Sequence, residues 1–304
     1  MRHACTIDVE DYCHVSAFDR RLPRESLDEW PSRVEASTER LLAIMAERSV
    51  CGTFFVLGRV ADRHPGLVKK LAAAGHEVAC HSQDHRLVYA MSPAEFRADL
   101  RRCKDTLEQL AGAAVAAYRA PSFSIVPRSL WALEILVEEG FAVDSSIYPV
   151  AHDRYGMPGA PTAPYRIATP AGALTEFPPT TVPICGWTAP VAGGGYFRLF
   201  PFAFTRWACR KVAGLGRPVN LYLHPWEFDP GQPRVPGLPL ATRFRHYVGL
   251  RRTASRFDRL LAALPFGTMS EALASVPAGP ALMVRNGRFV PTAEVAVLAA
   301  GTAP

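Results

Sequence analysis

Ala4-Cys5-Thr6-Ile7-Asp8-Val9 is a short apolar run that leads directly into acidic residues. A run of this length, with its polar residues at one end, predicts a buried β-strand with a polar carboxyl-terminal tip. The same form recurs along the chain. Further predicted strands span residues 52–58, 76–80, 114–118, 141–143 and 219–223. The titratable residues that directly follow four of these strands are His81, Arg119, Asp144 and His224.

Segments with apolar residues at helical spacing separate the first five strands, and they span residues 34–50, 65–74, 92–110 and 127–139. Ser92 and Glu95 form a capping-box pattern at the start of the third segment. Strands and helices that alternate from residue 4 to about residue 145 predict parallel strands with crossover helices, an α/β fold. The carboxyl ends of such strands carry the chemistry, so we expect the titratable residues to lie together.

The second half of the chain has a different pattern. Residues 150–218 are rich in proline and glycine, which predicts a loop-rich insertion with short strands. Beyond it, we expect a helix over residues 255–264 and an extended segment over residues 266–270. A hairpin is predicted over residues 283–290, with Asn286-Gly287 at its turn.

Composition and charge narrow the classes of function. The 304 residues are 49% apolar and 20% charged, which is typical of a globular protein with a large core. The formal charge is +6, but no basic run is interleaved with aromatic residues, which disfavours nucleic acid as a partner. A mildly positive surface would suit acidic glycans or anionic lipid headgroups.

The seven cysteines predict a reducing environment. Their number is odd and no two form a Cys-x-x-Cys pair, which favours buried thiols over a disulfide framework. We expect no signal peptide, because the first strand begins almost at Met1, and no apolar stretch approaches the length of about 18 residues that a membrane span needs. The predicted location is the cytoplasm, where partners could hold the protein at the inner membrane face.

Three carboxylates, those of Asp8, Glu10 and Asp11, lie within four residues at the end of the first strand. Like charges this close raise one another's pKa unless a cation is near. The segment is therefore either a solvated acidic turn or a site where one carboxylate binds a metal ion and another stays free as a base.

His81 and His85 lie four residues apart after a buried strand and can both point at one ion. Imidazole is a common ligand for zinc and similar metals, although two exposed histidines would give the same spacing. Two histidines with one carboxylate would leave coordination positions open for water and substrate, as a hydrolytic metal site requires.

Arg119 and His224 also follow predicted strands. Arg119 can orient a catalytic carboxylate and lower its pKa, or it can form an ordinary surface salt bridge. His224 can act as a general acid, or it can be a core histidine with satisfied hydrogen bonds.

In this order, these segments resemble the motifs of the polysaccharide deacetylases with a NodB homology domain, carbohydrate esterase family 4. The family's first motif usually reads Thr-Phe-Asp-Asp, in which the first Asp is the base and the second binds the metal. Thr6-Ile7-Asp8 is similar to its start, which implies that Asp8 is the base. Val9 stands in place of the second Asp, so Glu10 or Asp11 must supply the metal ligand, and Asp11 is the preferred candidate.

The other motifs carry over in the same way. His81-Ser82-Gln83-Asp84-His85 resembles the family's His-Ser/Thr-x-x-His motif, which implies that both histidines bind the metal. Arg119-Ala120-Pro121-Ser122 resembles the Arg-x-Pro motif, after which a backbone N–H, here that of Ser122, helps to hold the oxyanion. Leu223-His224 resembles the fifth motif and implies that His224 is the general acid, with Asp144 as the counterpart of the Asp that assists it.

The resemblance implies a distorted (β/α) barrel over residues 1–230, which includes the loop-rich insertion at about 150–218. Residues 231–304 would form a C-terminal extension packed on the barrel. Three segments are similar to the deacetylase subfamily of bacterial exopolysaccharide loci linked to protein sorting: Asp8–Tyr12, Gly193–Arg198 and His224–Glu227.

The implied activity is metal-dependent hydrolysis of the N-acetyl group of an amino sugar, in a polysaccharide or lipid-linked glycan of exopolysaccharide biosynthesis. Zinc is the implied ion, with cobalt, nickel or manganese as alternatives, and membrane-bound polysaccharide synthesis machinery is an implied partner. Trp187, Tyr196 and Trp226 are candidates for stacking on sugar rings, or for packing. Two rival functions stay open: hydrolysis of a cyclic amide or other non-peptide C–N bond on the same fold, and non-catalytic glycan binding.

Overall fold

The computed structural model describes residues 1–19, 21, 22, 27, 29–152, 154–285 and 287–292, and its centre is one large β-sheet. The strands of this sheet are β1 (His3–Val9), β2 (Thr53–Val56), β3 (Glu77–Cys80), β4 (Ala117–Tyr118), β5 (Val143–Asp144), β6 (Tyr165–Thr169), β7 (Gly172–Glu176), β10 (Asn220–Leu223), β11 (Phe266–Gly267), β12 (Ala281–Arg285) and β13 (Arg288–Pro291). They pair in the order β10-β1-β2-β3-β4-β5-β7-β6-β12-β13, and β11 also pairs with β1. A separate hairpin consists of β8 (Thr181–Ile184) and β9 (Trp187–Pro190).

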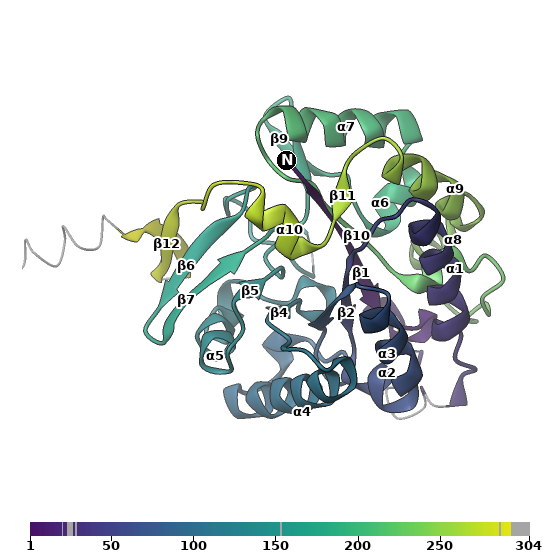
Figure 1. Ribbon diagram of the computed structural model, residues 1–304, viewed down its shortest axis with the longest axis horizontal. Coiled ribbons are helices and arrows are strands. Elements are labelled where there is room, and N and C mark those ends of the chain that lie inside the picture. The colour runs from purple at the N-terminus through teal and green to yellow at the C-terminus, as the bar shows by residue number, and fades with distance from the viewer. Residues whose placement is uncertain (20, 23–26, 28, 153, 286, 293–304) are drawn as a thin grey trace, which may run out of the picture.

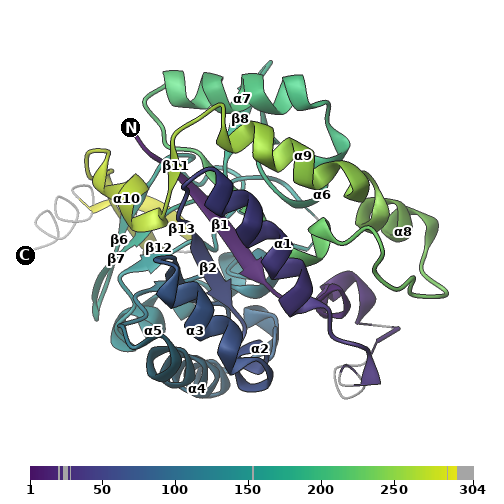
Figure 2. The same ribbon diagram turned by 45° about the vertical axis from the view of Figure 1, so that its right-hand side comes forward.

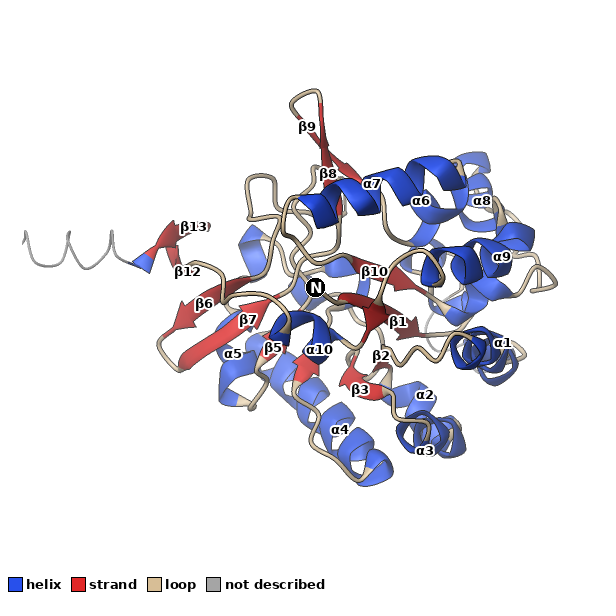
Figure 3. Ribbon diagram, turned by 45° about the horizontal axis from the view of Figure 1, so that its top comes forward, coloured by secondary structure: helices blue, strands red, loops and turns tan. Residues whose placement is uncertain are grey.

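Helices pack around the parallel strands, while the β8–β9 hairpin and strands β12 and β13 extend beyond them, as Figure 3 shows. The helices are α1 (Val34–Glu47), α2 (Gly58–Arg63), α3 (Pro65–Ala73), α4 (Pro93–Ala111), α5 (Ala132–Glu138), α6 (Gly194–Leu199), α7 (Phe202–Gly214), α8 (Leu240–Tyr247), α9 (Leu250–Leu261) and α10 (Met269–Ala274). In Figure 1, α2 to α5 lie together on one side of the sheet, while α7 covers the other end of the molecule. Figure 2 shows α1 beside α9, although the two helices are far apart in the sequence, and the two are in contact.

Strand β1 lies between β10 and β2 in the parallel part of the sheet. Its Ile7 pairs with Phe54 of β2 on one side and with Leu223 of β10 on the other. The pairs β2–β3, β3–β4 and β4–β5 are parallel as well. The segments that follow β1, β3, β4 and β10 therefore start at the same edge of the sheet, and the predicted α/β fold is confirmed.

Both faces of β1 are buried. Cys5, Ile7 and Val9 belong to the main hydrophobic core, whereas Ala4 packs with a second cluster that includes Phe55. Side chains alternate along a strand, so Thr6 and Asp8 share the face of Ala4. Along this face, the small side chains of Ala4 and Thr6 are followed by the carboxylate of Asp8, which lies at the edge where the strands end.

The insertion over residues 150–218 contains more helix than its sequence predicts. Besides two hairpins, it holds α6 and the long helix α7. Apolar periodicity gives a weak signal when the buried stripe of a helix consists of small side chains. The buried residues of α7 are Thr205, Ala208, Cys209 and Val212.

The segment after residue 230 adds strands to the same sheet. Strand β11 pairs with β1, and β12 pairs with β6. The extended segment predicted at residues 266–270 is shorter than expected, because Thr268 caps α10. The predicted hairpin is confirmed as β12 and β13, while Asn286 of its turn lies outside the described residues. The boundary near residue 230 stays a prediction.

All seven cysteines are free, as predicted, although Cys185 is exposed. Among the described helices, none combines the length and the apolar character that crossing a membrane requires.

Candidate active site

A cavity of about 180 Å³ lies where the carboxyl ends of β1, β3 and β10 meet. Most of the predicted site residues line this cavity, although they come from distant parts of the sequence. They are Asp8, Glu10, His81, His85, Ser122, His224 and Trp226.

The glycine run before Tyr196 forms one wall. Gly194 and Gly195 line the cavity, and a Cβ atom on Gly193 would lie 2.0 Å from a ring carbon of Tyr222. Because only glycine avoids this clash, the run lets α6 approach the tyrosine ring.

Glu10, His81 and His85 each place one ligand atom within 4.8 Å of the others, and all three are buried. His81 Nδ1 lies 2.8 Å from the carbonyl oxygen of Arg119. Since a carbonyl only accepts, Nδ1 carries the proton and Nε2 keeps a lone pair for a metal. His85 Nε2 lies 2.8 Å from Glu10 Oε2, yet this oxygen has no partner of acceptable hydrogen-bond geometry.

The charge states of these groups suit a divalent cation. Burial lowers the pKa of His81 to about 4, so the imidazole is neutral at pH 7. Burial would raise the pKa of Glu10, but the nearby His85 holds it well below its ordinary value. Two imidazoles and one buried carboxylate with an unpaired oxygen are the donor set of hydrolytic zinc sites. The residues present therefore fit such an ion.

The loop that carries the two histidines is held in an unusual conformation. Ser82 and His85 have φ values of 73° and 56°, in the left-handed region. Asp99 of α4 fastens this loop, because its Oδ2 accepts hydrogen bonds from Ser82 Oγ at 2.5 Å and Gln83 N at 2.9 Å. Asp99 was not among the predicted site residues.

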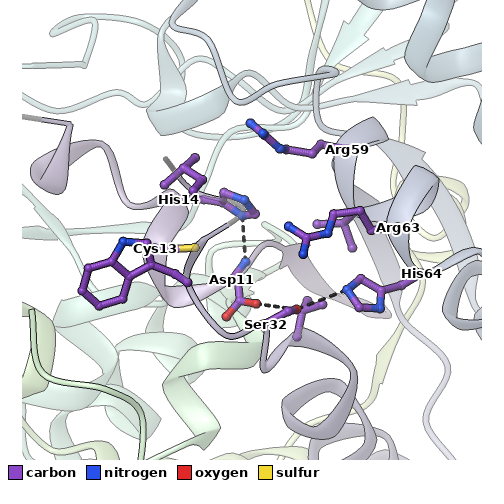
Figure 4. A pocket seen from close by; sticks show the side chains of 11 residues that line it. Asp11, Cys13, His14, Ser32, Arg59, Arg63 and His64 are labelled. Carbon is purple, nitrogen blue, oxygen red and sulfur yellow. Dashed lines mark hydrogen bonds between the residues drawn. The ribbon is translucent and has the colours of Figure 1, made fainter. Parts of the chain in front are cut away.

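Asp11, the carboxylate that the sequence favoured as metal ligand, points elsewhere. It begins a short 3₁₀ helix, and its Oδ1 accepts the N–H of Tyr12 at 2.9 Å. Its Oδ2 accepts from Ser32 Oγ at 2.7 Å and from Arg33 N at 2.8 Å. Figure 4 shows Asp11 turned toward Ser32, among side chains that belong to a different pocket. Hydrogen bonds occupy both of its oxygens, Oδ1 at the helix start and Oδ2 at Ser32 and Arg33, so the structure favours Glu10 over Asp11 as the ligand.

Asp8 and Arg119 form a buried ion pair. Arg119 is fully buried, and its Nη1 donates to Asp8 Oδ1 at 2.6 Å and to Thr6 Oγ1 at 2.9 Å. Its guanidinium group also lies 4.1 Å from the centre of the Phe55 ring and donates to Ser145. This packing excludes the surface salt bridge considered as an alternative and fixes the orientation of the Asp8 carboxylate.

His224 lies on the other side of Asp8. Its Nε2 is 3.8 Å from Asp8 Oδ2 and 3.5 Å from Glu10 Oε1. Its Nδ1 lies 2.7 Å from Glu227 Oε1, and Glu227 in turn accepts from Arg198 Nε at 2.5 Å. Burial lowers the pKa of His224, but the hydrogen bond to Glu227 and the neighbouring carboxylates outweigh it and raise the pKa to about 9.

Glu227, not Asp144, is thus the carboxylate that holds His224. Asp144 is fully buried, and its Oδ1 accepts from Ser146 Oγ at 2.5 Å. It lies beside Glu176, and burial raises its pKa to about 6. The spacing of three residues between His224 and Glu227 after a buried strand was the available sequence signal for this partner. Arg198 ends the segment Gly193–Arg198 that resembles the exopolysaccharide-locus subfamily, but no sequence signal linked it to Glu227.

The remaining candidates are distributed over the cavity and its surroundings. Ser122 has a φ of 51°, and its Oγ lies 2.9 Å from that of Ser16. Trp226 stacks on His224 with ring centres 5.2 Å apart, and Tyr196 lines an adjoining groove. Trp187 is 79% exposed on the β8–β9 hairpin and lines neither space.

Two family models match the chain. A polysaccharide deacetylase model covers residues 25–136, and a model described as a domain of unknown function (DUF3473) covers residues 145–274. The first contains His81, His85 and Arg119, and the second contains His224 and Glu227. Both matched regions therefore contribute to the cavity.

Two curated relatives resemble the chain over part of its length. A peptidoglycan-N-acetylglucosamine deacetylase of Bacillus cereus is 32% identical over 98 residues, which are 32% of this chain and 36% of the relative. A chitooligosaccharide deacetylase of Rhizobium leguminosarum bv. trifolii is 31% identical over 97 residues, which are 31% of this chain and 45% of the relative. The similarity thus spans less than half the length of each relative.

The fold is also found among solved structures. A crystal structure of a protein from Mycobacterium smegmatis, assigned as a polysaccharide deacetylase, superposes with a TM-score of 0.59 at 22% identity and covers 91% of each chain. At this identity the likeness concerns the fold alone, and it agrees with the predicted barrel-like α/β architecture.

Proposed function

We propose that this chain, which belongs to the polysaccharide deacetylase family, hydrolyses the N-acetyl group of an amino sugar in a glycan. One observation carries the proposal: a base, a metal-ligand set and an acid line the same cavity. Asp8 supplies the base, Glu10, His81 and His85 supply the ligands, and His224 supplies the acid.

A divalent cation held by Glu10, His81 and His85 would supply Lewis acidity toward the acetyl carbonyl and toward water. Zinc fits the donor set, with cobalt, nickel and manganese as alternatives. The Asp8 carboxylate takes the proton of the attacking water while Arg119 keeps the carboxylate in place. The oxygen of that water forms a bond to the acetyl carbon, and the backbone N–H of Ser122 helps to hold the oxyanion.

The leaving group is the sugar amine. His224 donates a proton from Nε2 to the amine nitrogen as the C–N bond breaks, and acetate and a free amino sugar result. The hydrogen bond from Nδ1 to Glu227 fixes the ring so that Nε2 faces Asp8 and the cavity. Asp8 thus takes a proton from the attacking water, and His224 gives a proton to the leaving amine. The two groups lie close together, with 3.8 Å between Asp8 Oδ2 and His224 Nε2.

The biological setting belongs to the same proposal. Similarity to the exopolysaccharide-locus subfamily supports a role in exopolysaccharide biosynthesis, with a polymer or lipid-linked glycan as substrate. A cytoplasmic location beside membrane-bound synthesis machinery agrees with such a role. The C-terminal segment after residue 230, which the subfamily adds, would pack on the barrel as part of this enzyme.

Acetate release tests the proposal. The purified protein is stripped of metal and incubated with N-acetylglucosamine oligomers, alone and with zinc, cobalt, nickel or manganese. We expect acetate only when a divalent ion is added. Acetate release at full rate without any ion would contradict the metal dependence. No release from any N-acetylated oligosaccharide would favour the two rival functions, the cyclic amide hydrolase and the glycan-binding protein.

A further inference from the structure

A second hollow adjoins the catalytic cavity. This groove has a volume of about 490 Å³, within the range of small-molecule sites. It shares Ser122, Tyr222 and Trp226 with the catalytic cavity, so the two spaces are continuous. A glycan with one sugar in the catalytic cavity would therefore extend into the groove.

The groove is cationic. Among the described residues, its lining contains three arginines and no aspartate or glutamate. Arg198 is neutralised by Glu227, but neither Arg154 nor Arg245 has an ion-pair partner in the described part of the chain. Arg245 is exposed on α8. Two guanidinium groups are thus left to bind an anion, for which their planar, two-pronged geometry is suited.

Aromatic side chains accompany these charges. Tyr155, Tyr196 and Phe244 line the groove together with the shared Tyr222 and Trp226. Phe244 is 57% exposed, so its ring is accessible to a ligand in the groove. Aromatic faces combined with cations favour a ligand that has both a ring with an apolar face and a negative charge.

The catalytic cavity, as far as the described residues line it, offers no such free guanidinium group. Arg119, the arginine beside it, is already paired with Asp8, so its guanidinium group is not left for an anionic group on the sugar that loses its acetyl group. The negative charge therefore belongs to the neighbouring unit.

We propose that the groove binds a carboxylate-bearing sugar next to the N-acetylated one, so that the substrate is an acidic glycan. This inference rests on the proposed function. The aromatic lining favours a sugar ring as the carrier of the charge, because a phosphate group alone would make no use of it. The positive formal charge of the chain agrees with this choice.

The test compares two matched ligands. One is a tetrasaccharide in which N-acetylglucosamine alternates with glucuronic acid, and the other is the same tetrasaccharide with its carboxylates converted to methyl esters. Acetate release gives kcat/KM for each, and titration of the protein gives each Kd. At low salt we expect wild-type protein to favour the acid over the ester about fivefold, as suits a half-exposed ion pair. Molar salt should reduce this ratio toward one.

Arg245→Gln should bring the preference for the acid over the ester, in Kd and in kcat/KM, close to one. Arg154→Gln should lower this preference as well. The matched control is Arg210→Gln, which removes the same charge from an exposed position of α7 outside both spaces and should keep the wild-type ratio. Thermal unfolding confirms that each variant is folded.

Equal affinity of wild-type protein for acid and ester would overturn the inference, and so would an equal loss of preference in Arg210→Gln. Tighter binding of N-acetylglucosamine 1-phosphate than of the acidic tetrasaccharide would assign the cations to a phosphate instead. If neither tetrasaccharide nor any neutral oligomer released acetate, the proposed function would fail, while the two Kd values would still decide the ligand.

Discussion

Substitution of Glu10 and of Asp11, one at a time, separates metal binding from folding. Glu10→Gln replaces a ligand oxygen by an amide and leaves the size of the side chain unchanged. Asp11→Asn makes the same chemical change one residue later, at a carboxylate that caps a 3₁₀ helix. We expect the first variant to lose zinc, and the second to keep zinc and lose stability.

The magnitudes follow from the contacts. Loss of a residue that only supports a metal ligand typically costs 10- to 100-fold in affinity, so loss of the Glu10 ligand itself should weaken zinc binding by about 100-fold or more. Asp11 Oδ2 accepts two hydrogen bonds, from Ser32 Oγ at 2.7 Å and Arg33 N at 2.8 Å. An amide nitrogen in its place cannot accept either, which should cost about 2 kcal/mol. For a chain of this size that corresponds to a fall in Tm of roughly 4 °C.

Two measurements on the same samples check this prediction. Zinc content after dialysis against a competing chelator gives the relative affinity, and thermal unfolding of the metal-free protein gives the Tm. In metal-free protein, Glu10→Gln removes a carboxylate that lies 2.8 Å from His85 Nε2 and whose pKa His85 lowers, so the Tm of this variant should fall too, and the zinc content separates the two variants. Loss of zinc from Asp11→Asn together with its retention in Glu10→Gln would refute the ligand assignment.

Three further predictions concern the acid, the base and a buried acid pair. Asp8→Asn should lower kcat for acetate release by about 100-fold or more while zinc binding persists, and wild-type turnover would contradict its role as base. Glu227→Gln should lower kcat/KM at least about tenfold, and more than Asp144→Asn does, because only Glu227 holds His224; the reverse order would return that role to Asp144. Burial raises the pKa of Asp144 to about 6 and that of Glu176 well above its ordinary value, so these protonated acids stabilise the fold fully below about pH 4, and this contribution is lost as pH rises through about 6. Glu176→Gln should therefore reduce the loss of unfolding free energy between about pH 5 and pH 8. Denaturant titrations at each pH measure this loss, and an unchanged dependence of the unfolding free energy on pH would contradict the prediction.

The strands of the parallel sheet and the residues at their ends could be predicted because their signals are local. A buried strand requires an apolar run, and the residue after it lies at the sheet edge whatever the rest of the chain does. His81, Arg119 and His224 were found in this way, and all three lie around Asp8. Helix α7 was missed because its buried stripe consists of small residues.

Side-chain direction beyond a strand end could not be predicted. Glu10 and Asp11 are neighbours of similar chemistry, and their roles are decided by the 3₁₀ helix that starts at Tyr12. That helix needs a side-chain acceptor at its first position, and Asp is well suited to it. Once Asp11 serves as the cap, Glu10 is the carboxylate that remains for the two histidines.

Glu227, the hydrogen-bond partner of His224, connects the catalytic site to the C-terminal part of the chain. A buried glutamate beside a buried histidine needs a further cation to stay ionised, and Arg198 supplies it at 2.5 Å. Arg198 in turn donates to the carbonyl oxygens of Arg245, His246 and Val248, at the carboxyl-terminal end of α8. These carbonyls carry the negative end of the helix dipole, so they stabilise the guanidinium charge. Without α8, Arg198 would keep Glu227 alone as an acceptor, and the buried cation would become costly. The segment after residue 230 therefore supports the position of the general acid, although it supplies none of the groups proposed to react.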